Sequence, residues 1–258
     1  MAMLEVKNCS IAFGGLKALS GLDFSLQAQE LMGIIGPNGA GKTTFFNLLT
    51  GVYDPTEGEI FFDGTLVNPL VPHQINRLGV ARTFQNIRLF PELSVLDNVR
   101  VAFHHRIRYS LWDSVLARRR FAEEEEQVRL EALRLLQGFN LEKHKDEKAK
   151  NLSYGDQRRL EMVRALATHP KLLLLDEPAA GMNASEKRDL IQLIRKLHTE
   201  LKLAILLIEH DMGVVMNLCP RLLVLDYGVP IAEGSPEEIR KNPKVIEAYL
   251  GQARTPHQ

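Results

Sequence analysis

One stretch near the start of the sequence has the residue types and spacing of a phosphate-binding loop (P-loop). An apolar segment, residues 31–35, is followed by three glycines, a lysine and two threonines, and then by an apolar helix start at Phe45. Glycines let backbone N–H groups converge on an anion, and the following helix N-terminus adds partial positive charge. Lys42 can reach the β- and γ-phosphates of a nucleotide, and the Thr43 hydroxyl can bind Mg²⁺. The residues predicted to bind ATP here are Gly36, Pro37, Asn38, Gly39, Ala40, Gly41, Lys42, Thr43 and Thr44.

Two acidic residues end a second apolar run. Residues 172–175 are all leucine, and Asp176 and Glu177 follow them. An aspartate at a strand end beside a phosphate-binding loop can hold Mg²⁺, and the next carboxylate can polarise a water for attack on the γ-phosphate. Alone, such a strand end would be common. Next to the glycine-rich loop it predicts that Asp176 is a metal ligand and Glu177 a catalytic base.

Two further segments could contact phosphate. His210 follows the next apolar strand, where an imidazole can hydrogen-bond the γ-phosphate and the attacking water. A lone histidine after a strand is more often structural, but its place after the strand that follows Glu177 favours catalysis. Ser153 precedes an amphipathic helix predicted at 158–168. It is either only a helix cap or, with Gly155, a phosphate contact at a helix N-terminus.

Apolar patterning predicts the elements that position these residues. Continuous Leu, Ile and Val runs are typical of strands covered on both faces, as in a parallel sheet, so the expected fold class is α/β. Residues 90–164 are instead charged and helix-like, with an amphipathic helix predicted at 123–137. Strands are expected at 4–6, 22–26, 59–62, 171–175, 203–208 and 221–225, a helix at 185–201 and short helices at 236–250.

Length and composition narrow the class of protein. A chain of 258 residues can form one large domain or a domain with a subdomain. The 32 Lys and Arg residues balance 32 Asp and Glu residues, so no global field attracts nucleic acid, and no nucleic-acid partner is expected. The 2 cysteines make no disulfide framework, which favours a reducing compartment. The N-terminus is unlike a signal peptide, and no apolar run is long enough to span a bilayer.

Together these motifs resemble those of the ATP-binding subunits of ABC transporters, over essentially the whole chain. In that family a signature loop lies between the P-loop and the acidic strand end, and Leu152–Asp156 occupies that place. The family's glutamine loop looks like Gln85, which implies that Gln85 is catalytic and binds the metal with Thr43 and Asp176. Its adenine-stacking aromatic looks like Phe13, for which a core position is an equally open interpretation.

Two residues depart from the usual signature loop, Leu-Ser-Gly-Gly-Gln. Tyr154 replaces a glycine and Asp156 replaces the glutamine. Residues 154–159 nevertheless look like one branch of the family, the larger ATPase subunit of branched-chain amino acid importers, as do residues 82–90, 176–181, 208–212 and 242–251. We predict that Ser153 and Gly155 still meet a partner's γ-phosphate. Because a carboxylate repels phosphate, Asp156 is expected to face away and to pair with Arg158 or Arg159.

The resemblance implies a single ABC ATPase domain over residues 1–258. It implies a P-loop NTPase core of the ABC ATPase type at about 1–86 and 165–258, an N-terminal antiparallel β region, and an inserted helical subdomain at about 87–164. Two such subunits would bind ATP and Mg²⁺ head to tail and hydrolyse the ATP. The catalytic residues would be Glu177, His210, Gln85 and Lys42.

The resemblance also implies partners and a location. Expected partners are membrane permease subunits, a second ABC ATPase subunit and, indirectly, a substrate-binding protein. The expected assembly is a heterodimer of ATPase subunits, with a homodimer as the alternative. The expected location is peripheral, at the cytoplasmic face of the inner (plasma) membrane.

Other classes of protein are alternatives to this interpretation. The chain could be the ABC ATPase of another transporter, or a soluble ABC ATPase acting on ribosomes or in DNA repair. Soluble members usually carry tandem cassettes or long coiled-coil insertions, and this sequence has neither. A P-loop kinase needs an acceptor site and a lid, and a GTPase needs a guanine-reading Asn-Lys-x-Asp segment, which the sequence lacks.

Overall fold

A computed structural model describes residues 2–103 and 119–252. The chain divides into two compact units, one formed by Met1–Arg82 with Lys171–Gln258 and the other by Thr83–Pro170. The ends of the predicted helical subdomain, residues 87 and 164, both lie in the second unit. Residues 104–118 of that predicted subdomain lie outside the described residues.

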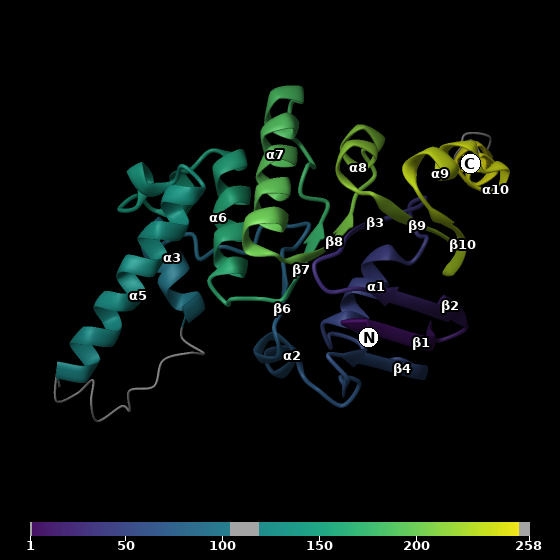
Figure 1. The fold of residues 1–258 in the computed structure, drawn as a ribbon, viewed down its shortest axis with the longest axis horizontal. Helices are drawn as coiled ribbons and strands as arrows, with labels where there is room; N and C mark the ends of the chain where they lie inside the picture. The colour runs from purple at the N-terminus through teal and green to yellow at the C-terminus, as the bar shows by residue number, and fades with distance from the viewer. Residues whose placement is uncertain (1, 104–118, 253–258) are drawn as a thin grey trace. The chain divides into compact units, whose positions relative to one another are not determined.

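A six-stranded sheet forms the centre of the first unit (Figure 1). Its strands, in spatial order, are β10 (Val229–Gly234), β9 (Arg221–Asp226), β3 (Leu31–Ile35), β8 (Ala204–Ile208), β7 (Leu172–Asp176) and β6 (Val80–Arg82). All neighbours from β9 to β6 pair in parallel, and β10 is an antiparallel edge strand. Every residue of β3, β7 and β8 is buried, as their continuous apolar sequences predict.

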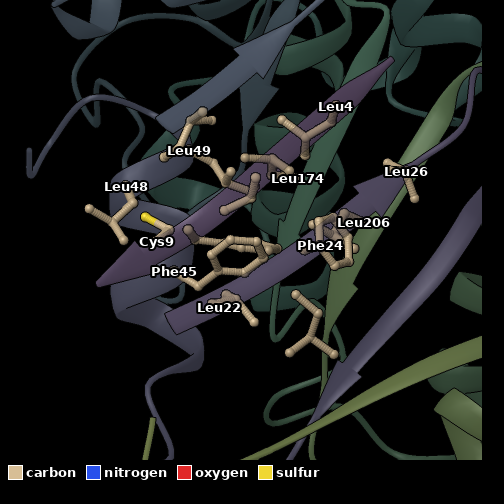
Figure 2. Packing of buried hydrophobic residues seen from close by; sticks show 14 of the residues in the cluster. Leu4, Cys9, Leu22, Phe24, Leu26, Phe45, Leu48, Leu49, Leu174 and Leu206 are labelled. Atoms are coloured by element: carbon tan, nitrogen blue, oxygen red, sulfur yellow. The ribbon is translucent and has the colours of Figure 1, made fainter. Parts of the chain in front are cut away.

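A second, four-stranded sheet in this unit is antiparallel, which confirms the predicted N-terminal β region. Its order is β2 (Leu16–Leu26), β1 (Leu4–Phe13), β4 (Glu57–Phe62) and β5 (Thr65–Leu66). Helix α1 (Lys42–Leu49) packs between the two sheets, with the Phe45 ring edge-on to Phe24 at a centroid distance of 5.3 Å. Leu174 of β7 and Leu206 of β8 belong to the same buried cluster (Figure 2). This packing fixes the N-terminus of α1 beside the ends of the parallel strands.

The opposite face of the large sheet is covered by α7 (Ala184–Leu201) and α8 (Met212–Leu218), as Figure 1 shows. Asn183 begins α7 by accepting hydrogen bonds from the N–H groups of Ser185 and Glu186. Helix α2 (Pro72–Leu78) precedes β6, and α9 (Pro236–Lys241) and α10 (Pro243–Gln252) follow β10. The loops that carry the predicted site follow the carboxyl ends of the parallel strands.

After a non-helical segment at residues 83–93, the described residues of the second unit are mainly helical. Its α-helices are α3 (Val95–Ala102), α5 (Arg119–Gly138) and α6 (Tyr154–Leu166), with 3₁₀ turns at Glu142–His144 and Ala149–Asn151. Asn98, which is fully buried, donates to the Phe90 carbonyl and accepts from the Phe90 N–H, each at 2.9 Å. The loop before α3 is therefore held against its own helix.

Several boundaries differ from the sequence-based expectation. The strands predicted at 4–6 and 22–26 are longer, because each continues as a hairpin strand with a polar outer face. The helix predicted at 158–168 runs from Tyr154 to Leu166, because Ser153 caps it. Strands β6 and β10 were not predicted, since one is 3 residues long and the other is a half-exposed edge strand containing Pro230.

Candidate active site

The glycine-rich loop between β3 and α1 is packed so closely that side chains are excluded at two of its glycines. Gly36 and Gly41 both have positive φ angles, 148° and 98°. A Cβ atom on Gly36 would lie 2.0 Å from the Leu225 carbonyl oxygen, and one on Gly41 would lie 2.6 Å from the Ala18 oxygen. Helix α1 has no side-chain cap at Gly41. Its first N–H groups therefore face the loop, as an anion site requires.

Lys42 is buried within this loop, with 7% of the residue exposed. Its ammonium group donates to the carbonyl oxygens of Gly36 and Pro37, at 2.7 and 2.8 Å. Burial lowers the pKa of Lys42, and the negative charges of Glu177 and Asp176 partly oppose that shift. The lysine therefore shares one electrostatic environment with both acidic residues, while Thr43 is exposed on the first turn of α1.

The ends of β7 and β8 bring the predicted catalytic pair together. Asp176 lies opposite Ile208 in the parallel register, and the Glu177 N–H donates to the Ile208 carbonyl at 2.9 Å. Glu177 has a φ angle of 48°, and its Oε2 lies 3.7 Å from Nδ1 of His210. Asp176 is buried, and its Oδ2 lies 2.7 Å from the guanidinium of Arg82. The structure thus places Glu177 beside His210, and Asp176 beside Arg82, a cation for which the motifs predict no role.

Glu209, between Ile208 and His210, ties the two strand ends to each other. It is fully buried, and its Oε1 accepts from the N–H of Ala179 at 2.7 Å. Its Oε2 accepts from the N–H groups of His210 and Asp211 at 3.2 and 3.4 Å. Burial raises the pKa of Glu209, and these backbone donors partly oppose the increase. A single carboxylate therefore fixes the loop after Glu177 relative to the loop that carries His210.

We predict that Glu209→Gln lowers the stability of the protein by about 1–3 kcal/mol, the usual cost of leaving a buried donor without an acceptor. The amide nitrogen necessarily faces at least one of the N–H groups that the carboxylate now accepts from. Urea unfolding measures the change. The control is Glu233→Gln, since Glu233 pairs with Arg221 at the surface and such pairs contribute about 0–1 kcal/mol. Equal losses of stability in the two variants would contradict the role of Glu209 in fixing the two loops.

The predicted adenine-stacking residue is not in the core. Phe13 ends β1 and is 45% exposed, which removes the alternative of a core aromatic. Its ring packs edge-on against Tyr53, with centroids 5.0 Å apart. Both rings belong to the first unit, which also carries the P-loop.

The remaining predicted residues, Gln85, Ser153 and Gly155, lie in the second unit. Ser153 caps α6, because its Oγ accepts from the Asp156 N–H at 3.2 Å and donates to Asp156 Oδ2 at 2.9 Å. Asp156 Oδ1 lies 3.5 Å from Arg159, so the predicted pairing with one of two arginines is confirmed for Arg159. Gly155 is in the first turn of α6, and Gln85 is an exposed residue.

Known proteins are similar to this chain over almost its full length. Residues 19–180 match the family model described as ABC transporter. The chain belongs to the ABC transporter family. A second family model, described as branched-chain amino acid ATP-binding cassette transporter, matches residues 229–255, from β10 into the C-terminal end. The resemblance inferred from the motifs is thereby confirmed.

Curated relatives in bacteria and archaea are similar across nearly all of this ABC ATPase. The high-affinity branched-chain amino acid transport ATP-binding protein LivG of Escherichia coli K12 is 45% identical, with 97% of this chain and 98% of that protein covered. BraF of Pseudomonas aeruginosa, which has the same description, shows the same identity and coverage. A probable LivG of Archaeoglobus fulgidus is 37% identical over 97% of this chain and 96% of that protein.

Solved ATP-binding cassettes have the same fold. A nucleotide-free cassette from an ABC transporter superposes with a TM-score of 0.82 at 32% identity, covering 96% of this chain and 99% of that one. A cassette solved in its ADP conformation gives a TM-score of 0.84 at 32% identity, covering 97% of this chain and 99% of that one. The predicted α/β fold of an ABC ATPase is confirmed. In the part of the chain that the structure describes, no helix combines the length and the apolar character that a membrane span needs.

Proposed function

We infer that this chain is the ATP-hydrolysing subunit that energises a membrane importer for branched-chain amino acids. The observation that carries this inference is the 45% identity, over 97% of the chain, to proteins described as high-affinity branched-chain amino acid transport ATP-binding proteins. The proximity of Lys42, Glu177 and His210 supports the hydrolytic part of the proposal. A chain that only bound nucleotide would not need a carboxylate and an imidazole at the ends of two neighbouring strands.

The proposed roles follow from the position of each side chain. The Lys42 ammonium exchanges the carbonyl oxygens of its own loop for the β- and γ-phosphate oxygens of ATP, which are stronger acceptors because they are charged. Glu177 accepts a proton from the attacking water, and His210 donates to the γ-phosphate. Phe13 offers an exposed ring for adenine.

Magnesium fits the oxygen ligands that the motifs supply. The hydroxyl of Thr43, the carboxylate of Asp176 and the amide of Gln85 are the hard donors that this cation prefers, together with phosphates. Bound there, Mg²⁺ would neutralise charge on the β- and γ-phosphate oxygens. Asp176 is already held at one oxygen by Arg82, which restricts the positions its carboxylate can take.

We further propose that the working assembly contains two ATPase subunits. Ser153 and Gly155 of one subunit would contact the γ-phosphate bound by the P-loop of the other, because a hydroxyl and an N–H at a helix start suffice for that contact. The second subunit is proposed to be a different, co-encoded ATPase. The pair would act on permease subunits at the cytoplasmic face of the membrane, supplied by a substrate-binding protein.

A reconstituted transporter tests the function. The chain is assembled with the co-encoded permease subunits and second ATPase in proteoliposomes, and ATP hydrolysis is measured with the co-encoded binding protein outside. The binding protein loaded with leucine, isoleucine or valine is expected to stimulate hydrolysis and to drive uptake of the amino acid. The control is the same binding protein offered histidine or glutamate. Equal stimulation by those solutes, or none by any, would contradict the proposed substrate class.

A further inference from the structure

The residue that departs most from the usual signature loop makes a specific contact in the second unit. Tyr154 is half-exposed, and Arg158 lies one helical turn further along α6. The Arg158 guanidinium donates to the Tyr154 hydroxyl at 2.8 Å, and the guanidinium carbon lies 5.3 Å from the centre of the tyrosine ring. A glycine at position 154 could make neither contact.

Arg158 extends from α6 to the backbone around Gln85. Its Nη1 donates to the Phe84 carbonyl at 2.7 Å, and its Nη2 donates to the Gln85 carbonyl as well as to the Tyr154 hydroxyl. Only 3% of Arg158 is exposed. The two N–H groups of Nη2 are therefore shared between the signature loop and the glutamine loop of the same subunit.

Glu161 holds the other side of the glutamine loop. It is buried, it lies 3.6 Å from Arg158, and its Oε1 accepts from the N–H groups of Phe84 and Arg88 at 3.3 Å each. Burial raises the pKa of Glu161, while the two backbone donors and the neighbouring arginines oppose the increase. The segment from Phe84 to Arg88 is thus fixed by α6 through one arginine and one glutamate.

A buried guanidinium keeps a defined position only while its N–H groups are paired, because an unpaired buried charge is costly. The Tyr154 hydroxyl is the acceptor that directs Nη2 at the signature-loop end. Without it, water is the available replacement at this half-exposed side chain, and water does not impose one orientation on the arginine. The orientation of the Gln85 carbonyl therefore depends on the residue at position 154.

We propose that Tyr154 is a positioning residue: through Arg158, its hydroxyl holds the backbone at Gln85, so that the signature loop and the glutamine loop of one subunit move together. This inference rests on the proposed function, in which the signature loop contacts the partner's ATP and Gln85 binds the metal of its own. Binding of the signature loop to the partner's ATP thereby changes the position of Gln85 in the subunit's own nucleotide site.

Hydrogen exchange of the full-length chain tests the contact without reference to activity. Tyr154→Phe removes one oxygen from a half-exposed residue and leaves the ring in place, so folding is preserved. Amide exchange in the segment 84–88 is expected to accelerate by about three- to tenfold, the scale of one hydrogen bond exchanged for water. Exchange in β7 should not change. The matched control is Tyr227→Phe, which removes the same atom from a residue that is 81% exposed. Unchanged exchange at 84–88 would overturn the proposal.

Steady-state kinetics of the assembled transporter test the consequence for hydrolysis. Tyr154→Phe is expected to lower the kcat for ATP by about three- to tenfold with KM unchanged, because the Tyr154 hydroxyl is not among the groups proposed to contact ATP. A general loss of structure would instead lower thermal stability and affect KM as well. Accelerated exchange with wild-type kcat would show that the contact carries nothing to the reaction and would overturn the positioning role. A wild-type complex without solute-stimulated hydrolysis would contradict the proposed function and leave the exchange result standing.

Discussion

Glu177→Gln is expected to leave ATP binding intact and to slow hydrolysis by about 10²–10⁴-fold, the usual contribution of a positioned general base. The amide has the shape of the carboxylate but no basicity. The backbone of Glu177 is held by its N–H bond to the Ile208 carbonyl, which the substitution does not touch. Single-turnover hydrolysis of radiolabelled ATP measures the effect. The control is Glu200→Gln, an exposed glutamate on α7. Wild-type turnover would mean that Glu177 is not the base.

The Glu177→Gln variant also tests whether the dimer contains one kind of ATPase subunit or two. MgATP that is bound but not hydrolysed should hold the dimer together, because each signature loop closes the nucleotide site of the other subunit. The dimer should then persist long enough for its size to be measured. We expect Glu177→Gln to dimerise weakly alone and tightly with the co-encoded second ATPase. Light scattering with and without that subunit distinguishes the two cases. A tight homodimer that gains nothing from the second subunit would contradict the heterodimer.

The sequence predicted the parts of the site that follow one another along the chain. The P-loop is a local pattern of strand, glycines and helix, and the structure places Lys42 where that pattern requires it. Asp176 and His210 were predicted because each ends a continuous apolar run, and parallel strands bring such ends to one edge of the sheet. Local sequence order and apolar runs were sufficient to predict where these residues lie, while their roles stay predictions.

Residues that act through tertiary contacts could not be predicted in this way. Arg82 reaches Asp176 from a strand of 3 residues, across 94 positions of sequence. Glu209 lies within a recognised motif, yet its burial and its bond to Ala179 appear only when β7 and β8 are neighbours. Arg158 was expected only as a candidate partner for Asp156, whereas it faces the carbonyls of Phe84 and Gln85. In each case the sequence contains the charge, but only the fold shows its partner.

Lys42→Ala is expected to weaken MgATP binding by at least about 10²-fold, because two or more charge-assisted hydrogen bonds at about 1.5–3 kcal/mol each are lost. The backbone N–H groups of the loop remain, so weak binding should persist. The Gly36 and Pro37 carbonyls lose their donor, and the removal of a buried charge offsets part of that cost. Titration calorimetry with MgATP measures the affinity.

The pH dependence of binding separates the lysine charge from a general disturbance of the loop. Burial lowers the pKa of Lys42 in the free protein, so its positive charge is lost at a lower pH than that of an exposed lysine. As pH rises through that lowered pKa, wild-type affinity for MgATP should decline, whereas Lys42→Ala should show a flat alkaline limb. Lys171→Ala, which removes an exposed lysine paired with Asp63, should keep both the wild-type affinity and the decline. Near-normal affinity in Lys42→Ala would contradict the assignment of the loop as the nucleotide site, since no other buried cation lies on the described part of that loop.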